Sequence, residues 1–462
     1  MKLDPTFCQA ISCILPSQEV KSMINAIEST NPVVAVRVND SKAGEIQNAN
    51  RVPWCEHGIF LDERPQFTFD PLFHAGCYYV QDPSSMFIYH VIKHLVTKPV
   101  KYLDLCAAPG GKTTAALQAL PSNSIVVAND IMPQRAQVLA ENVIKWGAGN
   151  CMVTCNKPQT FGEMTHEFDI IATDVPCSGE GMFRKDQEAV EQWSTTLVEQ
   201  CAARQRSIIN DVWNALKPGG IMIYSTCTFN TQENEEIVDY IVKTLGASVL
   251  DVPISQDWNI HPAINRDFSC YRFLPHRVKG EGLFMCVLRK NDAPIISSKL
   301  GKNKPNKASV PVAQVNQVKT WVQDGHYFYD KNGDIFATPS FIEQKLKEQY
   351  DRLHVIKEFG IKIGTVKGKK IVPSHQLAMS THINLNAFPC VEVNYSTATA
   401  YLRGDAIVVD AQQGYVLLKY KGVILGFTNN LGNRANNLYP KPWRIMSTHL
   451  PDNPPRVILI NY

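Results

Sequence analysis

One stretch constrains the fold of this chain more than any other: residues 101–117, which read KYLDLCAAPGGKTTAAL. A short apolar run stops at Cys106, small residues and Pro109 follow, and a helix-forming segment begins at Lys112. This order predicts a strand, a tight turn and a helix. Small residues let a ligand approach the backbone closely, and the N–H groups that open the helix favour a nucleotide-like ligand or an anion. The turn therefore indicates an α/β fold with a ligand site at this loop.

The commonest nucleotide-binding loops do not fit this turn. A phosphate-binding loop would share Gly111-Lys112-Thr113 but needs a glycine at position 106, which is cysteine, and the GxGxxG pattern of dinucleotide sites cannot be written here. After one helix, the strand-like run 124–129 is followed by Asp130, about twenty residues beyond the turn, where such folds hold ribose hydroxyls. The pattern favours a cofactor that carries a ribose but no phosphates.

Strand-like and helical stretches alternate between residues 100 and 290. Strands are expected at residues 101–105, 124–129, 151–154, 168–173, 221–225 and 283–288. The clearest helix is expected over residues 194–216, ended by Pro218-Gly219-Gly220. This alternation predicts a mainly parallel, doubly wound sheet of the Rossmann-like class. Ligands bind at the carboxyl ends of the strands in such sheets, which brings together the loops 106–112, 174–181 and 226–230.

Two cysteines and an aspartate open the second and third of these loops. Asp174 and Cys177 follow one predicted strand, and Cys227 follows another. Most unpaired cysteines are small buried hydrophobes, but these two begin loops that face the ligand crevice. A thiolate that adds to carbon 6 of cytosine makes carbon 5 nucleophilic enough to accept a methyl group. An aspartic acid can support the charge that develops at nitrogen 3, and a base must then remove the carbon 5 proton.

Three long motifs carry a family resemblance. DLCAAPGGKTT, DVPCSGEGMFRKD and YSTCTFNTQENEEIV resemble, in the same order, the signatures of the Nop/Sun family of RNA 5-methylcytosine methyltransferases. The C-terminal PSHQLAM, AYLRGD and GYVLLKYKGVILGFTNNLGNRANNLYPK are similar to the PUA-like tail of the bacterial ribosomal RNA methyltransferase F (RsmF) branch. The resemblance covers nearly the whole chain and implies methyl transfer from S-adenosylmethionine.

The resemblance also implies roles for individual residues. Cys227 is the expected nucleophile, Cys177 assists release of the methylated product, and Asp174 contacts the cytosine near the cofactor. Asp130 is expected to bind the ribose of the cofactor. The residues expected to bind S-adenosylmethionine are Cys106, Ala107, Ala108, Pro109, Gly110, Gly111, Lys112, Asp130 and Asp174. The sequence departs from the family after the third central strand, where Asn156 and Lys157 replace an acidic residue that lies near the adenine.

We expect an α/β methyltransferase core with a small α+β N-terminal module and a β-rich, PUA-like C-terminal region. The expected units are an RNA-binding module at 1–75, the methyltransferase domain at 76–292, a linker at 293–310, a small subdomain at 311–370 and a PUA-like RNA-binding domain at 371–462. The first unit has four candidates for RNA contacts, although a solvated surface is the commoner role of such residues: Arg37, Arg51, Trp54 and Arg64. In the last unit, basic and aromatic residues interleave in a pattern that fits RNA, at Arg434, Tyr439, Lys441, Trp443 and Arg444.

Composition sets the remaining expectations. Thirteen cysteines without regular spacing, and a start without an apolar signal core, indicate a cytoplasmic protein in a reducing compartment. No CxxC pair occurs, so no metal is expected. The sequence also lacks a run of roughly 18 apolar residues, so no membrane span is expected. The net charge of +3 permits an RNA partner without requiring one. We expect a monomer.

The combined expectation is an enzyme that methylates carbon 5 of a cytosine in RNA, with small-subunit (16S) ribosomal RNA as the expected substrate. A phosphotransferase that uses Gly111-Lys112-Thr113 is a weaker alternative, because the first glycine of its loop is missing. A second alternative is a non-catalytic RNA-binding or ribosome-assembly factor with a methyltransferase fold. The presence of both Cys177 and Cys227 argues against it, since a scaffold needs neither thiol at a crevice.

Overall fold

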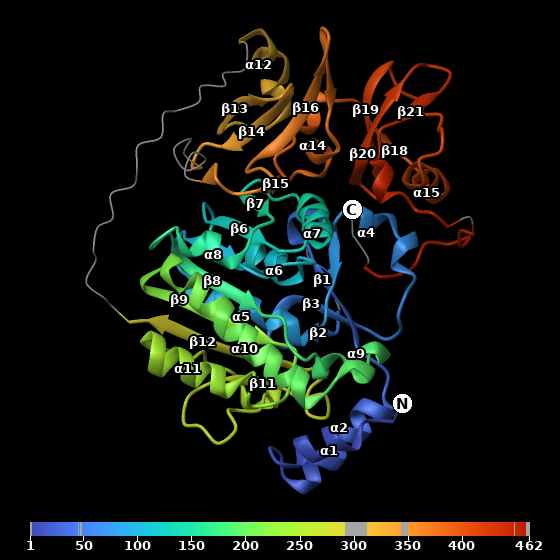
Figure 1. Ribbon diagram of the computed structural model, residues 1–462. Helices are drawn as coiled ribbons and strands as arrows, with labels where there is room; N and C mark the ends of the chain where they lie inside the picture. The colour runs from blue at the N-terminus through green and yellow to red at the C-terminus, as the bar shows by residue number, and fades with distance from the viewer. Residues whose placement is uncertain are drawn as a thin grey trace.

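The structure is a computed structural model that describes residues 2–44, 46, 49–291, 312–342, 350–447 and 449–458. A central α/β body carries a pair of helices at one end and two β-rich units at the other (Figure 1). The linker expected over residues 293–310 lies outside the described ranges.

The central sheet has nine strands in the order β10-β12-β9-β8-β5-β6-β7-β15, with β11 paired to β12. These strands are β5 (Lys101–Asp104), β6 (Ile125–Asn129), β7 (Cys151–Thr154), β8 (Phe168–Asp174), β9 (Leu216–Thr226), β10 (Ala247–Leu250), β11 (Tyr271–Phe273), β12 (Leu283–Lys290) and β15 (Val355–Lys357). Strands β5 to β9 pair in parallel, whereas β10, β11, β12 and β15 make antiparallel pairs at the two edges. The expected mainly parallel sheet is confirmed.

Helices cover both faces of this sheet (Figure 1). On one face lie α5 (Phe87–Leu95), α6 (Gly111–Ala119) and α7 (Pro133–Trp146), whose apolar residues pack against Tyr102, Val126 and Ile170. On the other lie α8 (Pro158–Gly162), α10 (Thr195–Val212) and α11 (Glu235–Leu245), which pack against Leu103 and Val127. Successive strand residues thus point into two separate cores, as expected of a buried parallel sheet. The doubly wound, Rossmann-like class is confirmed.

One predicted boundary in this body is wrong. The helix expected over residues 194–216 ends earlier, because α10 stops at Val212 and a 3-10 turn (Trp213–Ala215) follows. Strand β9 already begins at Leu216, so Pro218-Gly219-Gly220 lies inside the strand instead of ending the helix. The pairing of β8 with β9 shifts register at this point, and Gly219 has a positive φ of 72°. The two glycines therefore serve an irregularity in the strand, a role that glycine often has.

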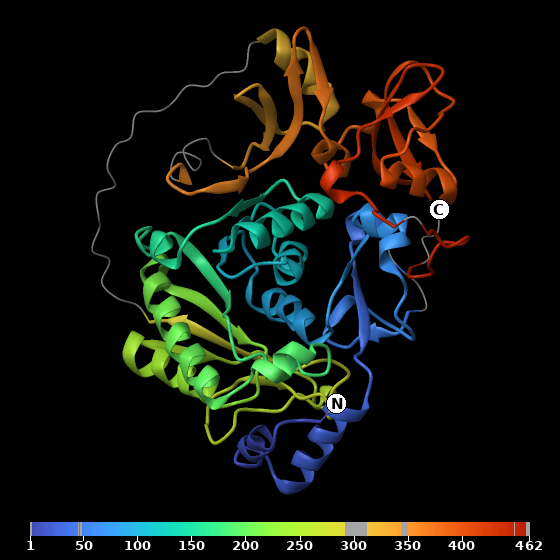
Figure 2. The same ribbon diagram turned by 45° about the vertical axis from the view of Figure 1, so that its right-hand side comes forward.

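The N-terminal residues form two parts. Helices α1 (Pro5–Ser12) and α2 (Ser17–Ser29) pack on Phe183, Trp193 and Phe229 of the central body, next to the loops that carry the two cysteines. A separate antiparallel sheet has the order β2-β3-β1-β4, from β1 (Val34–Val38), β2 (Arg51–Val52), β3 (Cys55–Leu61) and β4 (Tyr78–Val80). The short helices α3 (Asp40–Ala43) and α4 (Pro71–His74) accompany this sheet, and α9 (Gln187–Gln192) belongs to the central body. Figure 2 shows the helical pair and the small sheet on different sides of that body.

Two of the N-terminal residues considered for RNA contacts lie inside the protein. Arg37 is fully buried, and Trp54 is buried in the core cluster that also contains α5. Both join the small sheet to the central body: the Trp54 indole donates a hydrogen bond to the carbonyl of Pro83, and Arg37 donates to Thr114 and Gln118 of α6. The idea that these two side chains touch nucleic acid is therefore wrong.

The C-terminal residues form two small sheets. One has the order β13-β14-β16-β17, from β13 (His326–Lys331), β14 (Asp334–Pro339), β16 (Ile361–Lys367) and β17 (Lys370–Pro373), with α12 (Val312–Val318) before it and α14 (His375–Met379) after it. The other has the order β18-β19-β20-β21, from β18 (Cys390–Glu392), β19 (Gly414–Tyr420), β20 (Val423–Asn430) and β21 (Ala435–Asn437), with α15 (Tyr395–Arg403). The expected β-rich C-terminal region is confirmed.

A short segment of the C-terminal region completes the central body. Strand β15 pairs with β7 at the edge of the central sheet, which the sequence did not lead us to expect. Tyr350, Leu353 and Phe359 are buried in the core cluster that contains α10 and α11. The region after residue 311 is therefore not independent of the methyltransferase core.

We expect Phe359→Ala to lower the free energy of unfolding by about 3–5 kcal/mol, because it empties a fully buried site in that core. Phe341→Ala is the matched control, since Phe341 is 36% exposed and its loss should cost only about 1–2 kcal/mol. Urea unfolding of the full chain measures both. Equal effects of the two substitutions would show that this segment does not belong to the central core.

Candidate active site

The loop between β5 and α6 lines a small cavity at the carboxyl edge of the sheet. The cavity has a volume of about 180 Å³ and lies between residues 106–112, residues 79–82 with Ser85, and Asp174. A Cβ atom on Gly111 would lie 3.3 Å from the ring of Tyr79, so glycine at this position lets the two loops lie close together. The amide Nε2 of Gln81, which lines the cavity, is buried without a hydrogen-bond partner among the described residues. The cavity is small, and its unpaired amide donor suits a polar or anionic group of a ligand.

Asp104 lies beneath this loop, at the end of β5. Its carboxylate is 2% exposed and accepts a hydrogen bond of 2.7 Å from the Thr113 hydroxyl. Burial raises the pKa of Asp104 from 3.8 to about 7. The side chain is therefore partly protonated at neutral pH.

This raised pKa makes stability depend on pH. The folded protein binds the Asp104 proton more tightly than the unfolded chain, so this group costs stability as pH rises from about 4 to about 7, and the loss is complete above pH 7. We expect Asp104→Asn to stabilise the ligand-free protein at pH 8 by up to about 4 kcal/mol, and by much less at pH 5. Urea unfolding at the two pH values measures the difference. A gain of the same size at both would contradict this assignment.

Asp174 is held by two neighbours at the end of β8. Lys112 Nζ donates to Oδ2 at 2.8 Å, and the Ser225 hydroxyl donates to Oδ1 at 2.8 Å. Burial alone would lower the pKa of Lys112, but the Asp174 carboxylate outweighs it and the pKa is raised. An ammonium and a carboxylate thus lie side by side at one end of the cavity.

The two cysteines meet across the second and third loops. Their sulfur atoms are 3.1 Å apart, and the backbone N–H of Cys227 donates to the Cys177 sulfur at 3.3 Å. The hydrogen bond with the Cys227 thiol, together with burial, raises the pKa of Cys177 well above its usual value. Cys177 is therefore a protonated thiol at neutral pH, in contact with the sulfur of Cys227.

Two buried glutamates hold these loops together. Glu180 Oε2 accepts hydrogen bonds from the backbone N–H groups of Phe229 and Asn230, at 2.7 and 2.9 Å. Glu233 accepts from the backbone N–H of Ser178 at 3.0 Å, and burial raises its pKa. Each acid thus bridges from its own cysteine loop to the other. We did not single them out in the sequence, although both lie within the motifs quoted above.

The other expected cofactor residues lie near the loop with partners of their own. Asp130 is 3% exposed, accepts from the backbone N–H of Met132 at 3.0 Å, and lies 3.4 Å from an Arg135 nitrogen. Asp130 does not line the cavity. Asn156 uses both ends of its side-chain amide to hold the backbone of His354, which precedes β15. Its amide is thus engaged with the C-terminal region instead of being available to an adenine.

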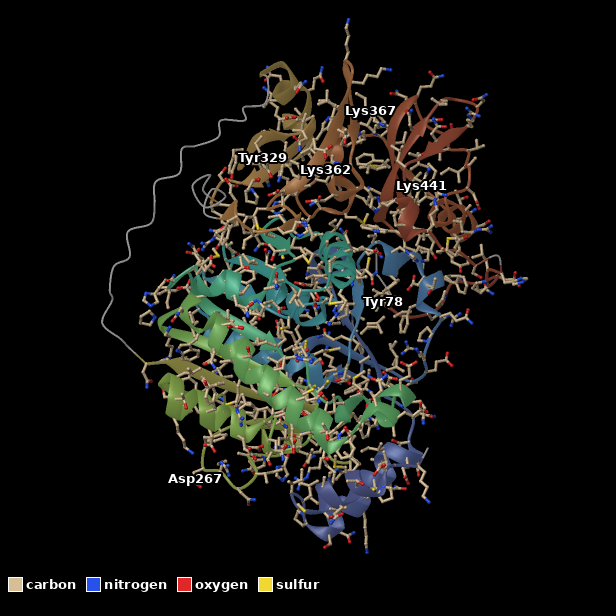
Figure 3. The ribbon with its side chains drawn as sticks, in the orientation of Figure 1. Tyr78, Asp267, Tyr329, Lys362, Lys367 and Lys441 are labelled. Carbon is tan, nitrogen blue, oxygen red and sulfur yellow. The ribbon has the colours of Figure 1, made fainter. Side chains whose placement is uncertain are left out.

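Part of the expected RNA surface in the last unit is core. Tyr439 is 3% exposed and shares a hydrogen bond of 3.0 Å with His74, and its ring and that of Trp443 each lie about 5 Å from the ring of His375. Tyr439 thus joins the C-terminal region to α4, so the expected RNA contact of Tyr439 is wrong, whereas Trp443 is half-buried. Lys441, labelled in Figure 3, is exposed.

Within the described ranges, no helix is long and apolar enough to cross a membrane, and no group of three or more His, Cys, Asp or Glu side chains could hold a metal ion.

Three family models match this chain in sequence order. The model for the N-terminal domain of 16S rRNA methyltransferase RsmF matches residues 3–83. The model for 16S rRNA methyltransferase RsmB/F matches residues 96–289, and the model for the methyltransferase RsmF PUA domain matches residues 388–445.

Curated relatives agree with these models. The ribosomal RNA small subunit methyltransferase F of Aliivibrio fischeri strain MJ11 is 30% identical, and the similarity spans 84% of each chain. This chain belongs to the RsmF family. The protein of the same name from Escherichia coli O9:H4 strain HS is 29% identical to it, again over 84% of each chain. As a member of the RsmF family, the protein is an S-adenosylmethionine-dependent RNA methyltransferase.

Solved structures support the fold. NSun6 from Pyrococcus horikoshii, solved with the S-adenosylmethionine analogue SFG, superposes with a TM-score of 0.55 at 18% identity, over 63% of this chain and 99% of that one. The structure of PH0851 gives a TM-score of 0.56 at 22% identity, over 62% of this chain and 66% of that one. At these identities the likeness supports the methyltransferase fold of the RsmF family and nothing finer.

Proposed function

We propose that the protein methylates carbon 5 of a cytosine in small-subunit ribosomal RNA through a covalent bond between Cys227 and the base. The observation that carries this proposal is the contact of two thiols, 3.1 Å apart, in the loops that follow β8 and β9, the strands whose ends bring Asp174 and Ser225 together. Methyl transfer to a nitrogen or a hydroxyl oxygen needs no thiol, whereas carbon 5 of cytosine needs a nucleophile at carbon 6.

We assign the two cysteines the different roles that the family resemblance implies. The Cys227 thiolate adds to carbon 6, and the electron pair of the 5,6 double bond moves toward nitrogen 3. The hydrogen bond with Cys227 and burial raise the pKa of Cys177, which favours its thiol form. Once carbon 5 has accepted its methyl group and lost its proton to a base, the carbon–sulfur bond breaks. Cys177 lies close enough to the departing sulfur to assist its release.

Asp174 and Lys112 are proposed to serve the base. The charge that develops on the ring needs a proton or a hydrogen bond at nitrogen 3, the role proposed for Asp174, which must first take up a proton because a carboxylate can only accept. The Lys112 ammonium, which donates to Asp174 at 2.8 Å, adds positive charge beside the same position.

Residues 106–112 are proposed to hold S-adenosylmethionine, with Asp130 at its ribose. When bound, the cofactor supplies a methyl group on a positively charged sulfur. The target cytosine must be unpaired or turned out of its helix, because stacking hides carbon 6 from a thiolate. We also propose that the protein works as a monomer in the cytoplasm and that RNA is bound by its N-terminal and C-terminal units.

Nucleoside analysis tests this function. The protein is incubated with methyl-labelled S-adenosylmethionine and small-subunit ribosomal RNA, either free or within the subunit, and the RNA is digested to nucleosides. The expected result is label in 5-methylcytidine. Label in any other nucleoside would contradict the proposed chemistry. A protein that binds these RNAs but transfers no methyl group would instead fit the non-catalytic assembly factor.

A further inference from the structure

Arg37 on β1 is a buried cation next to the cofactor cavity. Its guanidinium is fully buried and lies 4.4 Å over the ring of Trp146. It donates hydrogen bonds to Gln81 Oε1 at 2.8 Å, Gln118 Oε1 at 2.5 Å, Thr114 Oγ1 at 2.5 Å and the Gly111 carbonyl at 3.4 Å. Every one of these acceptors is uncharged.

Arg37 has no carboxylate to neutralise it. None of the ion pairs between described residues includes Arg37, and the cavity's own lysine, Lys112, is already paired with Asp174. Asp82, also at the cavity, accepts backbone hydrogen bonds from Ser85 and Glu281. Burial lowers the pKa of Arg37 only to about 10, so it stays charged at neutral pH. A buried cation without a counter-charge is unfavourable, and an anionic ligand nearby would relieve it.

Gln81 connects this cation to the cavity. Its Oε1 accepts from Arg37 Nε, which fixes the orientation of the amide and leaves Nε2 as the remaining donor. Gln81 is 6% exposed and lines the cavity, and its Nε2 has no hydrogen-bond partner among the described residues. The Nε2 atom lies 3.5 Å from where a Cβ of Gly111 would be, so it is close to the first turn of α6. A buried donor without an acceptor is rare in proteins and indicates a missing partner.

We propose that Gln81, oriented and polarised by Arg37, binds the carboxylate of the methionine part of S-adenosylmethionine. This carboxylate is the one anionic group of the cofactor, and the positive end of the α6 dipole favours it at the same place. The proposal rests on the cofactor dependence of the RsmF family, and it does not depend on which atom of RNA is methylated. It makes the N-terminal sheet, through Arg37, a part of the cofactor site.

Calorimetric titration with two nucleosides tests this subsite. S-adenosylhomocysteine carries the carboxylate, whereas 5′-methylthioadenosine lacks the whole amino acid part. We expect Gln81→Met to weaken binding of S-adenosylhomocysteine about 10- to 100-fold, as expected for a lost hydrogen bond to a charged group, and to change binding of 5′-methylthioadenosine less than about twofold. Gln66→Met, at an exposed glutamine of the same N-terminal region, is the control and should change neither.

A second variant separates ligand binding from folding. Gln81→Glu keeps an acceptor for Arg37 and supplies its missing counter-charge, so the melting temperature of the ligand-free protein should not fall. The new carboxylate repels that of the ligand, so binding of S-adenosylhomocysteine should weaken at least as much as in Gln81→Met. Two results would overturn the assignment of the carboxylate to Gln81: if both variants weakened the binding of the two nucleosides equally, or if they weakened the binding of neither nucleoside. Failure of the proposed cytosine chemistry would leave these titrations unchanged.

Discussion

Replacing Cys227 by alanine is expected to lower the rate of methyl transfer at least about 1,000-fold, because the attacking sulfur is removed while the cofactor cavity stays intact. Cys177→Ala should also stop turnover, but at a later step. In the Cys177→Ala variant, Cys227 can still add to the base and carbon 5 can still be methylated. This variant should therefore accumulate as a covalent adduct with RNA. The rates are measured with methyl-labelled S-adenosylmethionine, and the adduct is seen as a retarded band on a denaturing gel.

Control variants make this experiment specific. Cys13→Ala removes an exposed thiol far along the chain from both loops and should leave rate and gel pattern unchanged. The double variant Cys177→Ala/Cys227→Ala should form no adduct, because the sulfur that bonds the base is gone. An adduct that persists in the double variant, or that forms in Cys227→Ala but not in Cys177→Ala, would reverse or refute the roles assigned to the two cysteines.

The second large effect is expected at a buried ion pair that contacts the backbone of the Cys227 loop. Arg272 and Glu235 are both almost completely buried, and Arg272 Nε donates to Glu235 Oε1 at 2.7 Å beside a second contact between Nη2 and Oε2. Arg272 also donates to the carbonyl of Phe229 at 2.7 Å, two residues after Cys227. We expect Glu235→Ala to destabilise the fold by about 3–5 kcal/mol, since it leaves a buried guanidinium without its counter-charge.

Asp239→Ala on the same helix is the matched control for Glu235→Ala. Asp239 pairs with Lys243 and Arg266 near the surface, so its loss should cost about 1 kcal/mol or less. Denaturant unfolding measures both variants. The double variant Arg272→Met/Glu235→Leu should recover much of the lost stability, because it removes both charges together. A double variant as unstable as Glu235→Ala alone would show that packing, and not the unpaired charge, is responsible.

Much of the central body could be predicted from the sequence. Buried parallel strands read as short apolar runs between turn residues, and the rule that ligands bind at their carboxyl ends predicts Asp174, Cys177 and Cys227 at one edge of the sheet. The structure places the two sulfur atoms in contact and Asp174 beside Lys112. The predicted start of strand β9, at residue 221, lies after its actual start at Leu216. Pro218-Gly219-Gly220 is a common helix ending, and the sequence carries no separate signal for an irregularity inside a strand.

Other features depend on partners far away in the sequence. Strand β15 is three residues long and is defined by its pairing with β7, so no periodicity could reveal it. Arg37 resembles any basic residue at a surface, and its burial appears only when Gln81, Gln118 and Thr114 are brought around it. Tyr439 fits an RNA-binding pattern equally well until its contact with His74 is seen. In each case the environment of a polar or aromatic side chain follows from tertiary contacts.

The most direct test of the central claim uses RNA in which carbon 5 of cytosine carries tritium. Small-subunit ribosomal RNA labelled in this way is incubated with the protein and unlabelled S-adenosylmethionine, and tritium released to water is compared with the methyl groups incorporated in a parallel reaction. Methylation at carbon 5 must expel one tritium for each methyl group added, so we predict a ratio of about one to one, with no release by Cys227→Ala. Methyl incorporation without release of tritium would contradict the account.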